Sequence, residues 1–466
     1  MLNAATSLRR PRRSRRRLLA CAAMAAVLAA SLATTSASAA PTAADDVAYT
    51  TSTVLIGSAD LIGALYQPVT PTANQSTALF LTHENSNFIG SIPCVQLAQR
   101  GFTVLCVKSQ YSDQALSDWN ALALDVSNSV TYLHSLATVK KVVLVGWSGG
   151  GAIMSYYQNV AENGLAACQA AARLDPCSDS LAGMPPADGV VLLDAIPGIA
   201  FDRLTALDAS VTNENNLNIR NESLDMFSAA NGYSTSGSSN YSQAFVNRYT
   251  QAQGARATKL TAQAQKLQQQ IARGTGQYSD DAPMPLGRDS AEIWQADNNL
   301  LSHTKGKYPV ISPGHPDGGA PEIVRSLRVT SADPAANDSW SGGGSPYTAN
   351  TFMSTTAIKA PNLRITADSI TGVDWSSTNT ATVDNVNGIT KPLLVMSMTG
   401  HYFLVPAEMY YDSAQHTNNK TLIFVEGASH GFTPCTACAT TPGEFGDTVA
   451  ETFNYVGNWV TANFGS

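Results

Sequence analysis

Short apolar runs alternate with stretches of helical spacing along the first part of the chain. Runs rich in Val, Leu and Phe have the pattern of strands buried on both faces, and they lie at residues 77–82, 102–107, 142–145 and 189–193. Over residues 114–136, and again after residue 152, apolar side chains recur every three or four positions, which predicts amphipathic helices. This alternation predicts a mostly parallel sheet that is covered by helices on both faces.

The stretch at residues 197–389 has a different pattern. It is rich in Ser, Asn, Gln, Thr and Gly, and its one long run of helical spacing lies at about residues 241–273. The alternation of strands and helices resumes with apolar runs at residues 392–396 and 421–425, and a terminal helix is expected at 447–464. We therefore predict one α/β domain that is interrupted by a large cap or lid of helices and loops.

The N-terminus has the pattern of an export signal. Seven arginines between Arg9 and Arg17 precede an apolar run at residues 18–33, and a small-residue cleavage pattern, Ala37-Ser38-Ala39, follows. The arginine-rich start resembles a twin-arginine signal, and the alternative is an ordinary Sec signal. The expected organisation is a signal at residues 1–39, core at 40–196, cap insertion at 197–389 and core again at 390–466.

Six cysteines remain once Cys21 leaves with this signal, an even count that is typical of disulfides in an exported chain. Sequence proximity favours the pairs 94–106, 168–177 and 435–438 among the fifteen connectivities that are possible. The alternative for Cys435-x-x-Cys438 is a redox pair or half of a zinc site, but no second motif of either kind accompanies it. Acidic residues outnumber basic ones, which argues against non-specific binding to nucleic acid or to anionic membranes.

One short motif carries candidate chemistry. Gly146-Trp147-Ser148-Gly149-Gly150 matches the pattern G-x-S-x-G, directly after a predicted strand and directly before a predicted helix. Glycines around the serine let the backbone pass closely through a sharp, strained turn, which exposes the hydroxyl at the carboxyl end of the strand. The alternative is a glycine-rich turn with an incidental serine. We interpret Ser148 as a candidate nucleophile.

A serine hydroxyl needs a base to act as a nucleophile, and His430 follows the last predicted strand, from where it can fold back over Ser148. The alternative is a surface loop histidine. The order of a strand with His83, the Ser148 turn and the His430 loop resembles the α/β-hydrolase fold, over about residues 47–195 and 390–464. This resemblance implies that Ser148 attacks a carbonyl carbon, that His430 moves the proton, and that a carboxylate orients His430.

The position of the carboxylate in the sequence departs from the commonest pattern of this family. Relatives often carry it after the next-to-last strand, as G-x-x-D-x-x-V-P, but the matching stretch here has Tyr402 in its place. Other relatives, such as those similar to haloalkane dehalogenases, carry an acid at the end of the strand after the nucleophile helix, where this chain has Asp194. We expect Asp194 to be the acid, with Glu408 as the alternative. His401 and Tyr402 either line the pocket or pack under the insertion.

The resemblance also implies two backbone N–H donors that stabilise an oxyanion. One would be the N–H of Gly149. The other would come from the turn after the third strand, where Glu84 replaces the usual glycine. Either Glu84 or Asn85 could be this donor, and we favour Asn85. We expect His83 to hold this turn through hydrogen bonds and not to take part in catalysis.

Together these features predict an exported serine hydrolase that cleaves a carboxylic ester through an acyl-enzyme. Amide cleavage, acyl transfer and C–C hydrolysis remain alternatives because the same triad supports them. A non-catalytic binding protein is less favoured because Ser148 and His430 occur in the right order. The expected partner is a small-molecule or acyl-ester substrate, and no cofactor or metal is expected.

Overall fold

The computed structural model describes residues 46–57, 61–330 and 344–465. The export signal that we predict at residues 1–39 lies outside these residues. None of the helices in the described part of the chain is both long and apolar enough to cross a membrane.

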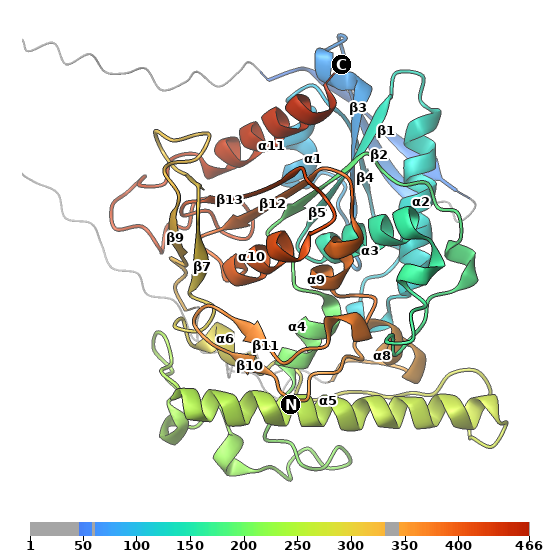
Figure 1. The fold of residues 1–466 in the computed structure, drawn as a ribbon, viewed down its shortest axis with the longest axis vertical. Helices are drawn as coiled ribbons and strands as arrows, with labels where there is room; N and C mark the ends of the chain where they lie inside the picture. Colours follow the sequence, from blue (N-terminus) through green and yellow to red (C-terminus); the bar gives the residue numbers. More distant parts are fainter. Residues whose placement is uncertain (1–45, 58–60, 331–343, 466) are drawn as a thin grey trace, which may run out of the picture. The chain divides into compact units, whose positions relative to one another are not determined.

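A nine-stranded sheet forms the centre of the fold, with the strand order β1-β2-β4-β3-β5-β6-β12-β13-β8 (Figure 1). β1 and β2 pair antiparallel with each other, β2 is antiparallel to β4, and every later pairing in the sheet is parallel. The strands are β1 (Tyr49–Ile56), β2 (Leu61–Pro68), β3 (Thr77–Leu81), β4 (Thr103–Val107), β5 (Lys141–Trp147), β6 (Gly189–Leu193), β8 (Val310–Ile311), β12 (Leu393–Met398) and β13 (Lys420–Val425).

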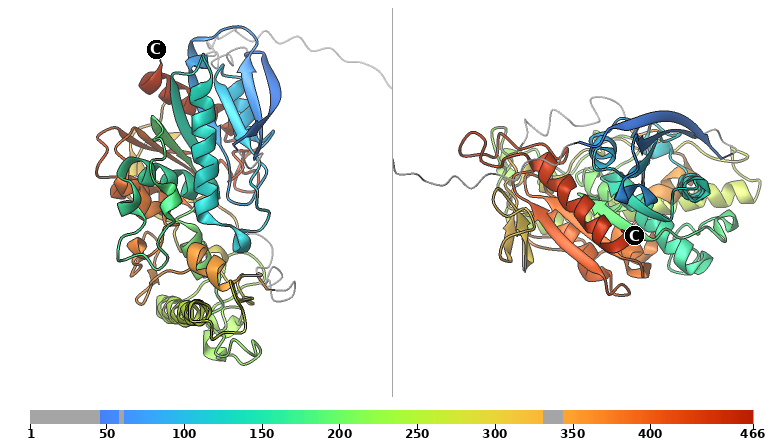
Figure 2. Two further views of the ribbon diagram at one scale, coloured as in Figure 1. Left: turned by 90° about the vertical axis from the view of Figure 1, so that its right-hand side faces the viewer. Right: turned by 90° about the horizontal axis from the view of Figure 1, so that it is seen from above.

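Side chains alternate between two buried faces of this sheet because successive residues of a strand point to opposite sides. On β5, Val143 and Val145 lie in one core with α1 and α11, whereas Val142 and Leu144 lie in a second core with α2, α3 and α10. Figure 2 shows helices on both sides of the sheet. The helices are α1 (Ile92–Ala98), α2 (Trp119–Ser135), α3 (Gly149–Asn163), α10 (Leu404–Ser413) and α11 (Thr448–Phe464). The predicted mostly parallel sheet, flanked by helices, is confirmed.

The helix predicted over residues 114–136 begins later than its apolar spacing suggested. Residues 114–116 form a single 3₁₀ turn, and α2 starts at Trp119. The Asp118 side chain accepts hydrogen bonds from the backbone N–H groups of Asn120 and Ala121, which satisfies two of the donors that a helix start leaves unpaired. The capping residue therefore sets the boundary, and the apolar residue Leu116 lies before it.

Residues 197–389 form most of the layer beyond the carboxyl ends of the strands. Its long helix, α5, covers nearly the predicted range and packs against α4 and α8 (bottom of Figure 1). This segment also contains more strand than we expected, because β8 joins the central sheet beside β13 and β7 pairs with β9. Its other elements are α4 (Ile199–Ala206), α5 (Gln243–Ala272), α6 (Ile293–Ala296), β7 (His303–Tyr308), β9 (Glu322–Arg325), α8 (Ala349–Thr355), β10 (Arg364–Ile365), β11 (Ile370–Thr371) and α9 (Thr382–Asn385).

The six described cysteines form three disulfides. They join Cys94 to Cys106, Cys168 to Cys177 and Cys435 to Cys438. These are the pairs that sequence proximity favoured, and Cys435 and Cys438 thus serve as a bridge that closes the loop after His430.

Candidate active site

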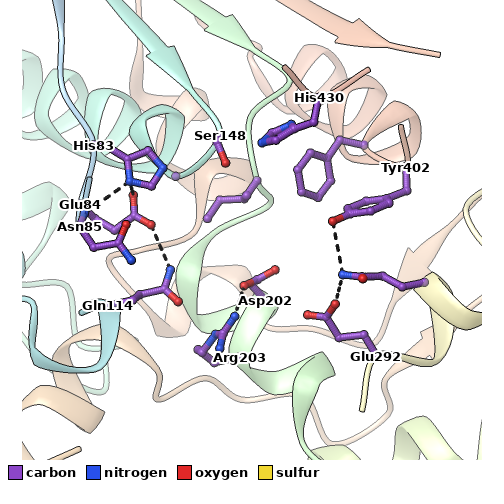
Figure 3. Close-up of a pocket in the computed structure, with 14 residues that line it drawn as sticks. His83, Glu84, Asn85, Gln114, Ser148, Asp202, Arg203, Glu292, Tyr402 and His430 are labelled. Carbon is purple, nitrogen blue, oxygen red and sulfur yellow. Dashed lines mark hydrogen bonds and ion pairs between the residues drawn. The ribbon is translucent and has the colours of Figure 1, made fainter. Parts of the chain in front are cut away.

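The carboxyl ends of four neighbouring strands bring the candidate residues together. Ser148 directly follows β5, Asp194 directly follows β6, and His401 and His430 lie on the loops after β12 and β13. Because parallel strands end at the same edge of a sheet, residues that are far apart in the sequence meet there. Figure 3 shows Ser148 and His430 beside a cavity at this edge.

Ser148 lies on a strained turn between β5 and α3. Its backbone has φ 56° and ψ −128°, a conformation that costs a residue with a side chain about 1–3 kcal/mol. Two of the flanking glycines lie where a side chain would not fit. A Cβ on Gly146 would collide with the backbone of Gly151, and a Cβ on Gly149 would collide with the carboxylate of Glu84. The motif thus forms the turn that its glycines predicted.

The imidazole of His430 contacts the carboxylate of Asp194. The His430 Nδ1 atom lies 2.7 Å from Asp194 Oδ2 with the alignment of a hydrogen bond. An ionised carboxylate can only accept hydrogen bonds, so Nδ1 carries the proton and Nε2 is left as a free base. In the described part of the chain no hydrogen bond joins the Ser148 hydroxyl to His430, although both groups line the same cavity. Such bonds are often long before substrate binds.

A second histidine approaches the same carboxylate oxygen, which the sequence did not indicate. The His401 Nδ1 atom also lies 2.7 Å from Asp194 Oδ2, and the rings of His401 and His430 stack with their centroids 4.4 Å apart. Only the His430 contact has the alignment of a hydrogen bond. His401 is buried, and burial lowers its pKa, although the attraction of Asp194 opposes the shift. His401 therefore packs as a second, buried imidazole against the triad candidates.

Asp194 is fully enclosed, with 0% of its surface exposed. Its other oxygen, Oδ1, accepts hydrogen bonds from Ser397 Oγ at 2.7 Å and from the backbone N–H of Met398 at 3.2 Å. Burial raises the pKa of the Asp194 carboxyl, but interactions with His401 and His430 outweigh it and hold this pKa well below its usual range. Asp194 is thus an ionised, rigidly held partner for His430, and its own backbone has a positive φ of 43°.

The loop that carries His430 is fixed at several points. Trp147, the residue before the candidate nucleophile, donates its indole N–H to the carbonyl oxygen of His430 at 2.9 Å. Thr399 Oγ1 accepts a hydrogen bond from the N–H of Gly427 at 2.7 Å, which ties the start of this loop to the end of β12. The role of Trp147 was missed because the middle positions of G-x-S-x-G are unrestricted in the motif.

The alternative acid, Glu408, has a different set of partners. It lies on α10, and its carboxylate accepts hydrogen bonds from the backbone N–H groups of Lys305 and Gly306 and from the Tyr308 hydroxyl. These contacts hold β7 against α10. The structure therefore brings Asp194, and not Glu408, to the imidazole of His430.

The two candidate oxyanion donors come from different segments, Asn85 from the turn after β3 and Gly149 from the start of α3. Gly149 is the first residue of α3, where a backbone N–H has no partner within the helix. The N–H of Asn85 points to His83 Nδ1 at a long 3.4 Å, and Asn85 and His83 both line the cavity. The carboxylate of Glu84 lies against Gly149 and accepts a hydrogen bond from Gln114. Glu84 therefore brings a carboxylate to the start of α3, which a glycine at position 84 would not do.

A cavity of about 300 Å³ opens beside Ser148 (Figure 3). One wall comes from the strand ends and includes Ser148, Gly149 and His430. The opposite wall comes from residues 197–389 and carries the charged or polar side chains of Asp202, Arg203, Glu292 and Gln295. The volume is at the lower end of the range for ligand pockets, about 300–1,000 Å³, so the cavity suits a small substrate.

Asp194, His401 and His430 form the one group of three in the described residues whose atoms could hold a metal ion. Their ligand atoms lie within 4.8 Å of one another. The two nitrogen–oxygen distances of 2.7 Å are much shorter than two metal–ligand bonds of about 2.0–2.2 Å would span in tetrahedral geometry. The geometry of this group is thus that of histidines held directly by a carboxylate.

Comparisons with known proteins give structural neighbours only, because no family model and no curated protein matches the sequence. One neighbour is a brefeldin A esterase, described as a bacterial homologue of human hormone-sensitive lipase, at 11% identity over 92% of this chain and 80% of that chain, with a TM-score of 0.37. A hormone-sensitive lipase from a metagenome library aligns at 11% identity over 89% and 84%, with a TM-score of 0.39. Est1E from Butyrivibrio proteoclasticus aligns at 9% identity over 90% and 100%, with a TM-score of 0.37.

The arrangement of the chain itself identifies the fold. An antiparallel β2 precedes a parallel sheet with helices on both faces, and the strained serine turn joins β5 to α3. The acid and histidine loops follow later strands at the same edge of the sheet. The chain has an α/β-hydrolase fold.

Proposed function

We propose that this protein is a serine hydrolase that cleaves carboxylic esters, with Ser148 as nucleophile, His430 as general base and Asp194 as the orienting acid. One observation carries the proposal. A serine on a strained strand-to-helix turn shares a cavity with a histidine whose Nδ1 atom is hydrogen-bonded to a buried carboxylate. This arrangement leaves His430 Nε2 as the free base beside the Ser148 hydroxyl.

The reaction proceeds in two halves. His430 Nε2 takes the proton of Ser148 as the hydroxyl oxygen attacks the ester carbonyl, and the resulting imidazolium returns this proton to the leaving alcohol. Water then attacks the acyl-enzyme by the same route and releases the acid. Asp194 keeps the proton of His430 on Nδ1 throughout and stabilises the imidazolium.

The developing oxyanion binds to the N–H groups of Gly149 and Asn85. The free N–H at the start of α3 supports the first assignment, and the place of Asn85 on the cavity wall supports the second. For Asn85, substrate must displace the long contact with His83 Nδ1. Loss of a single oxyanion donor typically costs about 10²–10³ in kcat.

Residues 197–389 act as a cap that selects the substrate. The cavity wall opposite Ser148 supports this assignment, because Asp202, Arg203, Glu292 and Gln295 all belong to this segment. The core on either side of it would then supply the chemistry, and the cap would supply the specificity.

The test compares Ser148→Ala with a matched control, Ser180→Ala, in which an exposed serine is replaced. Ser148→Ala should abolish hydrolysis of p-nitrophenyl acetate and labelling by a fluorophosphonate, whereas Ser180→Ala should leave both unchanged. Labelling that persists in Ser148→Ala would overturn the proposal.

We also infer that the chain is exported. Its three disulfides support this inference, since such bonds persist mainly in oxidising compartments. Expression of the full chain in a bacterium with intact export routes, followed by N-terminal sequencing, tests it. A protein recovered outside the cytoplasm that begins after residue 39 is expected, and an unprocessed cytoplasmic protein would contradict the inference.

A further inference from the structure

Carboxyl groups outnumber basic side chains around the cavity. Three carboxylates line the cavity, those of Glu84, Asp202 and Glu292, against one guanidinium, that of Arg203. Arg203 pairs with Asp202 at 2.7 Å, and in Figure 3 the Asp202 carboxylate lies on the side of Arg203 that faces Ser148. Within the described residues, neither Glu84 nor Glu292 forms an ion pair with a lysine or arginine.

The carboxylate of Glu84 has an unsatisfied oxygen. Only 2% of Glu84 is exposed; Oε1 accepts a hydrogen bond from Gln114 at 3.1 Å, whereas Oε2 has no hydrogen-bond partner. His83 Nδ1 lies 2.9 Å from Oε2, but this contact lacks the alignment of a hydrogen bond. A buried carboxylate oxygen without a hydrogen bond is costly, so a donor from a ligand in the cavity would satisfy it.

Glu292 is the carboxyl group at the opposite end of the cavity. It precedes α6, and its carboxylate accepts a hydrogen bond from Gln295, whose amide also reaches the Tyr402 hydroxyl. The groups that face Glu292 are Asp202 and Arg203 from α4 and Tyr402 from the loop after β12. Among the described residues that line the cavity, Arg203 is the one lysine or arginine, and its ion-pair partner is Asp202.

We propose that this cavity binds a small ester that carries a positively charged amino group, with the ammonium held by the carboxylates of Glu84, Asp202 and Glu292. This substrate class rests on the proposed ester hydrolysis at Ser148. An ammonium group donates three hydrogen bonds, which matches several acceptor oxygens around one small space. A long acyl chain fits poorly because few lining residues are apolar and the cavity holds only about 300 Å³.

The test uses two esters of almost equal shape that differ in charge. Nα-acetyl-lysine methyl ester carries an ammonium group, and Nα-acetyl-norleucine methyl ester has a methyl group in the same place. We expect kcat/KM for the lysine ester to exceed that for the norleucine ester by about tenfold or more, the factor that 1.4 kcal/mol of extra binding energy provides. The Nα-acetyl-glutamate α-methyl ester, which is anionic, should be the poorest of the three. A lysine-to-norleucine ratio of one or less would overturn the inference.

Variants connect this preference to the cavity. At pH 9, where the Glu292 carboxyl is ionised, Glu292→Gln should lower the ratio, and Asp202→Asn should lower it as a second, independent variant. Glu222→Gln is the matched control, because Glu222 is an exposed glutamate of the same segment that does not line the cavity. A ratio that neither cavity variant changes, or that Glu222→Gln lowers equally, would overturn the assignment.

The pH dependence adds an independent readout. Burial, together with repulsion from Asp202, raises the pKa of Glu292 to about 8. Glu292 therefore gains its charge as the pH rises through that range, while the lysine side chain, with a pKa of about 10.4, stays protonated. The ratio should rise from pH 7 to pH 9 in the wild-type protein, and Glu292→Gln should flatten the rise. A ratio that falls over this range would count against the role of Glu292.

Failure of the hydrolase proposal can be distinguished from failure of this inference. If wild-type protein does not hydrolyse even p-nitrophenyl acetate, the proposed chemistry is wrong. Calorimetry with Ser148→Ala then still tests the cavity, because tighter binding of the lysine ester than of the norleucine ester is expected without turnover. Equal or weaker binding of the lysine ester would refute the inference by itself.

Discussion

Replacement of Asp194 by asparagine tests the geometry of the active site most directly. Asp194 Oδ1 accepts two hydrogen bonds, from Ser397 Oγ and from the N–H of Met398, so the amide oxygen of an asparagine would keep that side. The amide NH₂ would then take the place of Oδ2 and face the Nδ1–H of His430. Two donors cannot pair, so His430 has to move its proton to Nε2, the atom that should accept the proton of Ser148.

The expected cost follows from this change of tautomer. A histidine with its proton on the wrong nitrogen loses about 10⁴ in kcat, which corresponds to about 5 kcal/mol of transition-state stabilisation. Initial rates with p-nitrophenyl acetate, normalised to folded protein by near-ultraviolet circular dichroism, measure this loss. KM should change much less than kcat, because the substituted atoms do not line the cavity wall that binds substrate.

Glu408→Gln provides the matched control, since it makes the same change at the other candidate acid. It weakens the hydrogen bonds to the backbone N–H groups of Lys305 and Gly306, which should cost about 1–3 kcal/mol of folding free energy but leave kcat near the wild-type value. If Glu408→Gln loses activity while Asp194→Asn stays within tenfold of wild type, the assignment of the acid is wrong.

Three further outcomes follow from contacts of the same cavity. Gly149→Ala should lower the free energy of unfolding in urea by about 1–3 kcal/mol, because the new Cβ collides with the carboxylate of Glu84. A variant as stable as the wild-type protein would contradict that close approach. Trp147→Phe removes the N–H that is donated to the His430 carbonyl, a hydrogen bond of about 0.5–1.5 kcal/mol. The loss should lower kcat by up to about tenfold. An unchanged kcat would mean that other contacts suffice to hold the loop. The pKa of Glu292 is about 8 in the folded protein and about 4.3 in the unfolded chain, so the free energy of unfolding falls as the pH rises from about 4.3 to 8. Glu292→Gln should therefore unfold at a higher urea concentration than wild type at pH 8.5, but not at pH 4. The same difference at both pH values would refute the raised pKa.

The parts of the site that local patterns determine were predictable from the sequence. The buried strand before Ser148, the glycines around it and the helix after it occur within a dozen residues, so their spacing alone predicts the turn. Asp194 could be singled out as a candidate because it directly follows a buried strand, at the place where some members of the resembling family carry an acid. Strand β8 of the central sheet was missed because it contains only two residues, and so short a run has no period to detect.

Contacts between distant segments could not be read from such patterns. The approach of His401 to the carboxylate of Asp194 depends on the register of β12 beside β6 and on the turn after β12. The Glu84 carboxylate meets Gly149 because β3 and β5 are neighbours in the sheet, although the two residues are far apart in the sequence. Both contacts result from tertiary packing, which a single sequence does not encode in any local spacing.

The attachment of residues 302–328 to the core has a consequence for protein engineering. β8 pairs with β13, the N–H of Leu327 donates to the carbonyl of Thr399 at 2.7 Å, and Ser326 Oγ donates to the carbonyl of His401 at the same distance. A chimaera that exchanged all of residues 197–389 for the corresponding segment of another hydrolase would remove an edge strand and two anchors of the His401 loop. Transplants confined to the stretches before β7 and after residue 344 would keep β8 and both anchors of the His401 loop, so altered selectivity could be sought there with these contacts intact.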